Sequence, residues 1–291
     1  MFHGAVGRAF TDALPELAAR CLREWGLRVD GPSMYGMCAL VLPVVRFADG
    51  RPAALKLQLV DEESAGEALA LRAWGEAGAG AVGLLAHDPE TGAMLLERLD
   101  ESRPLSAVPD AREAVGVLAR VLARLVAVPA PPGLRTLADM ADRMLAETPR
   151  ALTTLADEQE RRLVADCAAA LGEVAGEPGD RLLHWDLHYD NVLAGRPGTD
   201  RAHEWVALDP KPLAGDPGFE LFPALDNRFD PAEVRWRFDA LSEALGPAYD
   251  RERARAWTLG RVLQNVLWHS REGAHTLAPD HAEIARRLLG R

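Results

Sequence analysis

One short run in the chain concentrates the side chains that could do chemistry. Residues 182–193 read LLHWDLHYDNVL, so two imidazoles, two carboxylates and an amide stand between apolar flanks. Read as a strand, the run would place His184, Asp186 and His188 on one face, which suits a hydrolytic metal site. A catalytic zinc also needs a further ligand and an ordered outer shell, whereas the other histidines are isolated in the sequence. We therefore keep a metal-dependent hydrolase only as an alternative.

Asn191 indicates a different metal and a different reaction. It precedes a short apolar pair, and a later segment, EWVALD, ends on Asp209. If residues 192–193 and 205–208 pair as a hairpin, its two ends return to the same place. Asn191 and Asp209 then lie side by side, with Asp186 just upstream. An amide and a carboxylate suit Mg²⁺ with nucleotide phosphates as its other ligands, and a lone carboxylate suits activation of a hydroxyl. This order of residues is typical of protein-kinase-like phosphotransferases.

A lysine in the first third of the chain can supply the phosphate-binding part of such a site. In AALKLQL, residues 53–59, the leucines share one face of a strand and Lys56 lies on the other, where it can overhang a cleft. Glu67, on the helix predicted next, can pair with Lys56 and hold it on the α and β phosphates of a nucleotide. Glu63, one turn earlier, is the rival partner.

The loop before the first strand is a weaker signal. Residues 31–37, GPSMYGM, include Ser33 and lie where a glycine-bearing loop would cover the phosphates. The loop is not Gly-x-Gly-x-x-Gly, so an ordinary entry turn fits it equally well. No Walker motif occurs in the chain, which argues against the other large class of phosphotransferases.

The elements that must position these residues change character along the chain. Apolar runs at 38–47 and 53–59 flank a turn at Asp49–Gly50 and predict one hairpin. A helix with an acidic first turn is predicted over 62–77, and strands at 81–88 and 92–99 follow. Beyond Asp100 the periodicity predicts helices, which are expected over 110–128, 134–147, 158–175 and, with breaks at Gly246–Pro247 and Pro279, over 231–290.

These elements predict an α+β fold with two lobes. Residues 1–99 would form a small nucleotide-binding lobe with an antiparallel sheet and one long helix. Residues 100–291 would form a larger, mainly helical lobe that carries the catalytic and acceptor-binding residues. The connection near 97–101 joins them, and the site is expected between the lobes.

Composition limits the partners and the location. The net charge of −11 argues against a nucleic acid partner and is compatible with a cationic ligand. The start of the chain lacks the pattern of a signal peptide, and its apolar stretches are too short to cross a bilayer, so we expect a cytoplasmic protein without membrane contact. Cys21, Cys38 and Cys167 are scattered, which favours buried or inert thiols. We expect a monomer.

The chain resembles the aminoglycoside phosphotransferase family, and within it the branch of streptomycin and hydroxyurea kinases. The resemblance is carried by LVLPVVRFADGRPAALKL, GEALALRAWGEAGAGAVGLLAHDPETGAMLLERLD, LLHWDLHYDNVLAG and ALDPKPLAGDPGFEL, which appear in this order over nearly the whole chain. It implies that ATP and Mg²⁺ are used and that Asp186 is the catalytic base or orients the acceptor hydroxyl. Asn191 and Asp209 would hold Mg²⁺. Nucleotide binding would fall to Lys56, Glu67, the Ser33 loop and the backbone of Glu97, Arg98 and Leu99, while His184 and His188 would be structural.

The acceptor is less constrained than the chemistry. Many members of the family have glycine in place of Trp185 and a small residue in place of Asp190, so these two positions differ from the usual pattern. Carboxylates would suit the guanidinium or ammonium groups of an aminoglycoside such as streptomycin. The candidate acceptor residues are Trp185, Asp190, Asp216, Glu220, Asp226, Trp268, His269 and Glu272. A kinase of hydroxyurea or of another small hydroxylated metabolite would share every catalytic residue and is the alternative.

Overall fold

The hairpin expected near residue 50 forms the centre of an antiparallel sheet. In the computed structural model, which describes residues 4–36, 39–247 and 249–291, β3 (Ala39–Arg46) pairs with β4 (Pro52–Gln58). The chain turns at Gly50, whose φ of 67° suits glycine. The sheet has the order β1-β3-β4-β6-β5, with β2 beside β3; the added strands are β1 (Leu27–Val29), β2 (Met34–Tyr35), β5 (Leu84–His87) and β6 (Met94–Glu97). The expected hairpin is confirmed, and the two strands expected after the helix are present as β5 and β6. Met37 and Cys38 lie outside the described residues.

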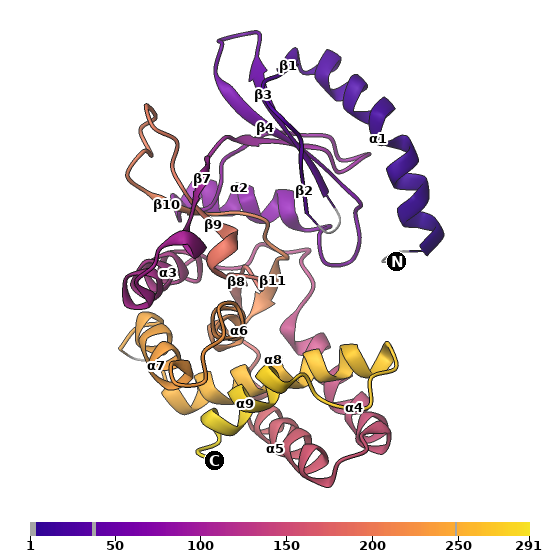
Figure 1. Cartoon of the computed structure of the whole chain (residues 1–291), viewed down its shortest axis with the longest axis vertical. Coiled ribbons are helices and arrows are strands. Elements are labelled where there is room, and N and C mark those ends of the chain that lie inside the picture. The colour runs from indigo at the N-terminus through magenta and orange to yellow at the C-terminus, as the bar shows by residue number, and fades with distance from the viewer. Residues whose placement is uncertain (1–3, 37–38, 248) are drawn as a thin grey trace.

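One face of the sheet is covered by a helix that was not predicted. α1 (Gly4–Glu24) lies along the sheet (Figure 1). Its residues Leu14, Leu17 and Cys21 belong to a buried cluster that includes Leu55 and Leu57 of β4. The spacing of three and four between the α1 residues was the available signal. Because Leu55 and Leu57 face α1, alternation turns the residues between them toward the opposite face of the sheet.

α2 (Glu67–Ala77) lies on that opposite face. The helix begins later than expected because Asp61 Oδ1 accepts hydrogen bonds from the backbone N–H groups of Glu63 and Ser64, which fixes a turn before it. The prediction that Glu63 belongs to the first helical turn is therefore wrong. The predicted stop is confirmed at Gly78, which adopts φ 63° at the C-cap.

Two small sheets follow the connection after β6. β7 (Asp100–Pro104) pairs with β9 (Val192–Ala194), and β9 pairs with β10 (Trp205–Ala207), with Val192 opposite Ala207. The hairpin expected at these positions is confirmed. β8 (Arg181–Leu183) pairs with β11 (Leu213–Gly215), so the run after residue 183 is not a strand as the hydrolase hypothesis required.

Helices make up most of the remaining chain, below the N-terminal sheet in Figure 1. Asp110 caps the first of them by accepting from the N–H groups of Arg112 and Glu113, as expected. A helix expected to end at residue 147 continues through Pro149. The helices are α3 (Ala111–Leu125), α4 (Leu137–Thr154), α5 (Glu158–Val174), α6 (Phe222–Asp226), α7 (Val234–Ala244), α8 (Arg251–Arg271) and α9 (Pro279–Leu288), with short 3₁₀ turns at Leu105–Ala107, Tyr189–Asn191 and Pro217–Glu220.

A continuous core joins α2 and β6 to the C-terminal helices. Trp74 of α2 is fully buried in it, and its indole N–H donates to the carbonyl of Leu125 over 3.1 Å. The Trp74 ring also stacks on His184, with centroids 6.1 Å apart. Trp74 therefore connects the N-terminal sheet region to the segment that carries the candidate catalytic residues.

The thiols that the structure describes are buried, as expected. Cys21 lies in α1 and packs against the sheet, and Cys167 lies in α5, where burial raises its pKa to about 12. Within the described ranges, no helix is long and apolar enough to span a lipid bilayer.

We expect Trp74→Ala to lower the free energy of unfolding by ~3–5 kcal/mol, because it leaves a large cavity in the core that connects the two lobes. Phe47, which is 68% exposed, is the control, and Phe47→Ala should change stability by no more than ~0.5 kcal/mol. Urea denaturation of both variants measures the difference. A cost below ~1 kcal/mol for Trp74→Ala would contradict this role.

Candidate active site

The segment after β8 is held from behind by buried polar groups. Trp185 adopts φ 67°, a left-handed conformation that a bulky residue rarely takes. Its backbone N–H donates to Glu220 Oε1 over 2.6 Å, and its carbonyl accepts from Arg261 over 3.4 Å. The guanidinium groups of Arg135 and Arg261 lie 4.2 and 4.3 Å from the Trp185 ring centroid. These contacts fix the position of the next residue, Asp186.

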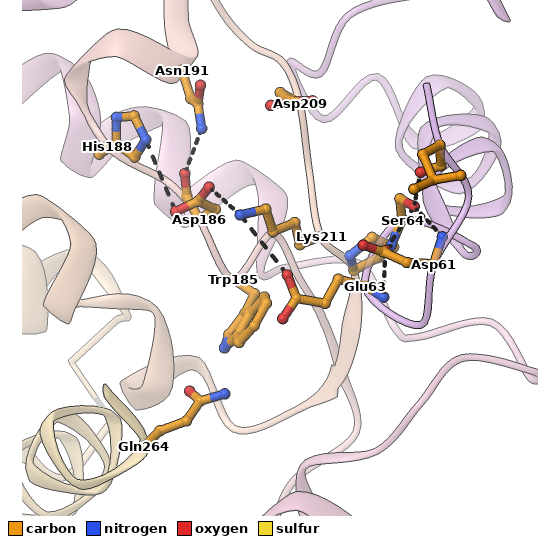
Figure 2. A network of polar contacts seen from close by, with 12 residues as sticks. Asp61, Glu63, Ser64, Trp185, Asp186, His188, Asn191, Asp209, Lys211 and Gln264 are labelled. Atoms are coloured by element: carbon orange, nitrogen blue, oxygen red, sulfur yellow. Dashed lines mark hydrogen bonds and ion pairs between the residues drawn. The ribbon is translucent and has the colours of Figure 1, made fainter. Parts of the chain in front are cut away.

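Asp186 lies at the centre of the polar network in Figure 2. Lys211 Nζ is 3.1 Å from its Oδ2, and His188 Nε2 is 3.9 Å from its Oδ1. Burial acts to raise the pKa of Asp186, but the charges of Lys211, His188 and Arg261 outweigh it and hold that pKa below the usual value. Asp186 is therefore ionised at neutral pH and can accept a proton.

Asn191 and Asp209 are brought together by the β9–β10 hairpin. The N–H of Leu208 donates to the carbonyl of Asn191 over 3.0 Å, which joins the two ends of the hairpin. The Asn191 side-chain NH₂ donates to the Asp186 carbonyl over 2.9 Å, so its oxygen faces away from Asp186 (Figure 2). Asp209 is about half exposed. An amide oxygen and a partly exposed carboxylate fit Mg²⁺ that keeps phosphate and water ligands.

Lys56 is buried in a cage of acceptors. Its ammonium lies 2.7 and 2.8 Å from the two oxygens of Glu67 and 2.5 Å from Asp209 Oδ1. Gln58, from the same face of β4, donates to Glu67 Oε2 over 2.7 Å. Burial would lower the pKa of Lys56, but the two carboxylates outweigh it and raise that pKa. The structure thus pairs Lys56 with Glu67, whereas Glu63 lies 4.0 Å from Lys211.

The histidines do not form a metal site with Asp186. His184 is buried, its Nε2 faces the Leu208 carbonyl at 3.0 Å, and burial lowers its pKa to about 4. His184 is therefore neutral and braces the segment, as expected. No cluster of three or more potential His, Cys, Asp or Glu ligands occurs in the part of the chain that the structure describes. The hydrolase alternative has no geometric support.

Glu97, Leu99 and Ser33, which were expected to bind the nucleotide, differ from one another in burial and contacts. The Glu97 carboxylate accepts from the Gly83 N–H over 3.1 Å and from Arg201 over 2.8 Å, so its side chain is engaged. Leu99 is buried, and Ser33 is exposed on the loop before β2. The side chains of Glu97 and Leu99 are therefore committed to contacts within the protein.

Three of the candidate acceptor residues, Trp185, Asp216 and Glu220, are buried. Asp216 is 3% exposed, accepts from the Tyr249 hydroxyl and lies 2.7 Å from Arg253 Nε. Glu220 is 2% exposed and binds the backbone of Trp185, which is itself buried. The side chains of Asp216 and Glu220 are engaged in contacts within the protein, and an acceptor could reach them only by displacing those contacts.

The other candidates lie nearer the surface in two groups. Asp190 is partly exposed and accepts from the Asn227 NH₂ over 2.8 Å. Asp226 lies 3.2 Å from His281, which stacks on His269, and His269 stacks in turn on Trp268. Glu272 is exposed at the end of α8. The structure therefore joins Asp226 to the His269 group and leaves Glu272 apart from these contacts.

Several residues of the site were missed in the sequence. Lys211 stands two positions after Asp209, and Gln58 stands two after Lys56, so proximity to a candidate residue was the available signal. Arg135 and Arg261 come from distant segments and gave no signal. Gln264, one turn after Arg261 on α8, accepts a hydrogen bond from it and lies near Trp185 (Figure 2).

The fold and the site define a protein-kinase-like phosphotransferase. The aminoglycoside phosphotransferase APH(4)-Ia, solved with ADP and hygromycin B, matches with a TM-score of 0.62 at 18% identity, over 94% of this chain and 96% of its own. The choline kinase LicA from Streptococcus pneumoniae matches with a TM-score of 0.60 at 13% identity, over 96% and 98% of the two chains. The expected α+β kinase-like fold is confirmed.

The chain belongs to the family of aminoglycoside/hydroxyurea antibiotic resistance kinases, whose model matches residues 24–273. The hydroxyurea phosphotransferase of Kitasatospora aureofaciens is 59% identical over 100% of this chain and 83% of its own length. The streptomycin 6-kinase of Streptomyces glaucescens is 52% identical over 99% and 93% of the two chains, and that of Streptomyces griseus is 50% identical over 98% and 92%. The protein is thus a kinase, as the sequence predicted.

The buried carboxyl of Glu220 gives a pH prediction. Burial raises its pKa from 4.5 to about 7 in the folded chain, so the folded state holds the proton more tightly than the unfolded state. The stability of the wild type relative to Glu220→Gln should therefore fall as pH rises from about 4.5 to about 7, by up to ~3 kcal/mol. Urea denaturation of both proteins across this range measures the difference, and a difference independent of pH would contradict the assignment.

Proposed function

We propose that this kinase transfers the γ-phosphoryl group of ATP to a hydroxyl of streptomycin or a closely similar aminoglycoside. The observation that carries the chemistry is the convergence of Lys56, Glu67 and Asp209 beside Asp186 and Asn191. Identity of 50–52% to two streptomycin 6-kinases, over nearly the whole chain, supports the acceptor.

Each charged group then has one task. Lys56, oriented by Glu67, binds the α and β phosphates. Asn191 Oδ1 and the Asp209 carboxylate would hold Mg²⁺, which when bound offsets the charge of the phosphates. Asp186 orients the acceptor hydroxyl and takes its proton.

The transfer itself balances as a simple displacement. The acceptor oxygen forms a bond to the γ phosphorus, and the bond from that phosphorus to the β–γ bridging oxygen breaks. ADP leaves with the electron pair of that bond, and the acceptor proton goes to Asp186. Positioning and charge neutralisation supply most of the rate.

Burial divides the candidate acceptor residues into two roles. Asp190 and Asp226 are 56% and 40% exposed at their side chains, so we propose them as partners for the guanidinium groups of the acceptor. Asp216, Glu220 and Trp185 are buried and engaged, and we propose them as supports of the catalytic segment. Trp268, His269 and Glu272 are proposed to border the acceptor on the side of α8.

Hydroxyurea is the second candidate acceptor. It is favoured by the 59% identity to the hydroxyurea phosphotransferase, which extends over the whole of this chain. Every catalytic residue above serves this acceptor equally, because only the nature of the attacking hydroxyl changes. A small uncharged acceptor would not need the exposed carboxylates.

We expect Asp186→Asn to lower kcat by ~10²–10⁴-fold, because the amide cannot take the proton of the acceptor. ATP should still raise the melting temperature of this variant, since Asp186 does not hold the nucleotide in our assignment. Lys56→Met is the matched comparison and should lose the stabilisation by ATP as well. ADP release and thermal shift measure the two effects, and undiminished turnover by Asp186→Asn would refute its role.

Asp190→Asn separates the two acceptors. If a guanidinium group binds Asp190, the variant should have a KM for streptomycin ~10-fold above that of the wild type. This corresponds to the loss of about 1.4 kcal/mol of binding free energy, as expected for a hydrogen bond between charged groups. KM for hydroxyurea, an uncharged molecule, should not change. ADP release with each acceptor in turn tests this. Turnover of hydroxyurea alone would reject the aminoglycoside and leave the kinase assignment intact.

A further inference from the structure

The backbone of Lys211, in the segment between β10 and β11, is held by hydrogen bonds to two other parts of the chain. Its N–H donates to the His184 carbonyl over 3.0 Å, and its carbonyl accepts from Arg135 over 3.0 Å. The same guanidinium reaches the Pro212 carbonyl at 3.3 Å and lies over the Trp185 ring. The base of the Lys211 side chain is thus held against the segment that carries Asp186.

The side chain of Lys211 is much less committed. Its ammonium lies 3.1 Å from Asp186 Oδ2 and 4.0 Å from Glu63 Oε2, so it stands between carboxylates of the two lobes (Figure 2). The side chain is 39% exposed, and that of Glu63 is 44% exposed. The ion pair with Glu63 is exposed on both sides and therefore weak, so the ammonium can give it up for another partner at little cost.

The neighbouring cations are already saturated or enclosed. Lys56 is buried and is bound by both Glu67 and Asp209. Arg261 is buried behind the Trp185 ring, and Arg135 is bound to backbone carbonyls. Lys211 combines contact with Asp186, a fixed backbone and a partly exposed ammonium group.

We propose that Lys211 is a catalytic residue whose ammonium contacts the transferred phosphoryl group in the transition state. This rests on the proposed function. Asp186 must lie beside the acceptor oxygen to take its proton, so a cation in contact with Asp186 is within reach of the phosphorus that this oxygen attacks. As that bond forms and the bond to the β–γ bridging oxygen breaks, charge spreads over three equatorial oxygens, and an adjacent cation stabilises it.

The role predicts a specific split between binding and turnover. Lys211→Ala should lower kcat by ~10²-fold and leave KM for ATP within about threefold of the wild type, because the contact is made mainly in the transition state. Lys211→Arg should retain part of the rate. Ethylammonium added to Lys211→Ala should restore part of it, since a free cation can occupy the vacated position.

A control variant addresses the alternative that Lys211 only links the lobes. Arg143 and Glu62 form another exposed ion pair between the two parts of the chain, at 3.4 Å and away from Asp186. Arg143→Ala removes that pair and should leave kcat unchanged. If Lys211→Ala does not fold, Lys211→Met, which keeps most of the apolar stem, replaces it.

A binding measurement completes the test without turnover. ADP, Mg²⁺, aluminium fluoride and the acceptor imitate the transferring phosphoryl group, and analogues of a transition state bind more tightly than substrates. Aluminium fluoride should raise the melting temperature of the wild type and Arg143→Ala further than ADP does. For Lys211→Ala, ADP should act as in the wild type and aluminium fluoride should add little.

The outcomes separate the two proposals. Wild-type protein that transfers no phosphoryl group to either acceptor overturns the proposed function itself. With an active wild type, the role of Lys211 is overturned if Lys211→Ala keeps kcat within threefold. It is also overturned if aluminium fluoride raises the melting temperature of Lys211→Ala as much as that of the wild type. A loss of stabilisation by ADP alone, as large as the loss seen with aluminium fluoride, would overturn it as well.

Discussion

The ammonium of Lys56 is the charge on which the rest of the structure depends. A buried cation is costly to remove from water unless it is fully paired. Here Glu67 comes from the N-terminal lobe and Asp209 from the C-terminal lobe, so the charge is satisfied only when both lobes are in place. The Lys56 ammonium therefore links the two lobes at the candidate site, in addition to the core around Trp74.

The segment that carries Asp186 is positioned by contacts from both lobes. Trp185 takes a strained backbone conformation, and Glu220 and Arg261 bind its N–H and carbonyl from the C-terminal lobe. Trp74 reaches His184 from α2 of the N-terminal lobe. Asp186 thus stands on a segment whose flanks are held by both lobes, while its own carboxylate faces the partly exposed Lys211.

Local patterns in the sequence were sufficient for much of the fold and for the main constellation. The β9–β10 hairpin follows from local pattern, and the structure contains it. Short spacing limited the partner of Lys56 to Glu63 or Glu67, and the structure pairs it with Glu67. Arg135 and Arg261 could not be found in this way, because they reach Trp185 from distant helices and loops. The burial of Glu220 likewise depends on tertiary packing. The sequence alone could therefore not distinguish a buried supporting carboxyl from an exposed carboxylate that binds the acceptor.

Two buried side chains beneath the segment that carries Asp186 have opposite effects on stability in mild acid. His184, with a pKa lowered to about 4, favours the folded state increasingly as pH rises to about 6.5. Glu220, with a pKa raised to about 7, has the opposite slope above about 4.5. Between about pH 4.5 and 6.5, unfolding adds a proton to His184 and removes one from Glu220, so the effects of the two groups on the pH dependence of stability cancel. Beneath Asp186, a buried imidazole and a buried carboxyl group thus offset each other's effect of pH on stability within this interval.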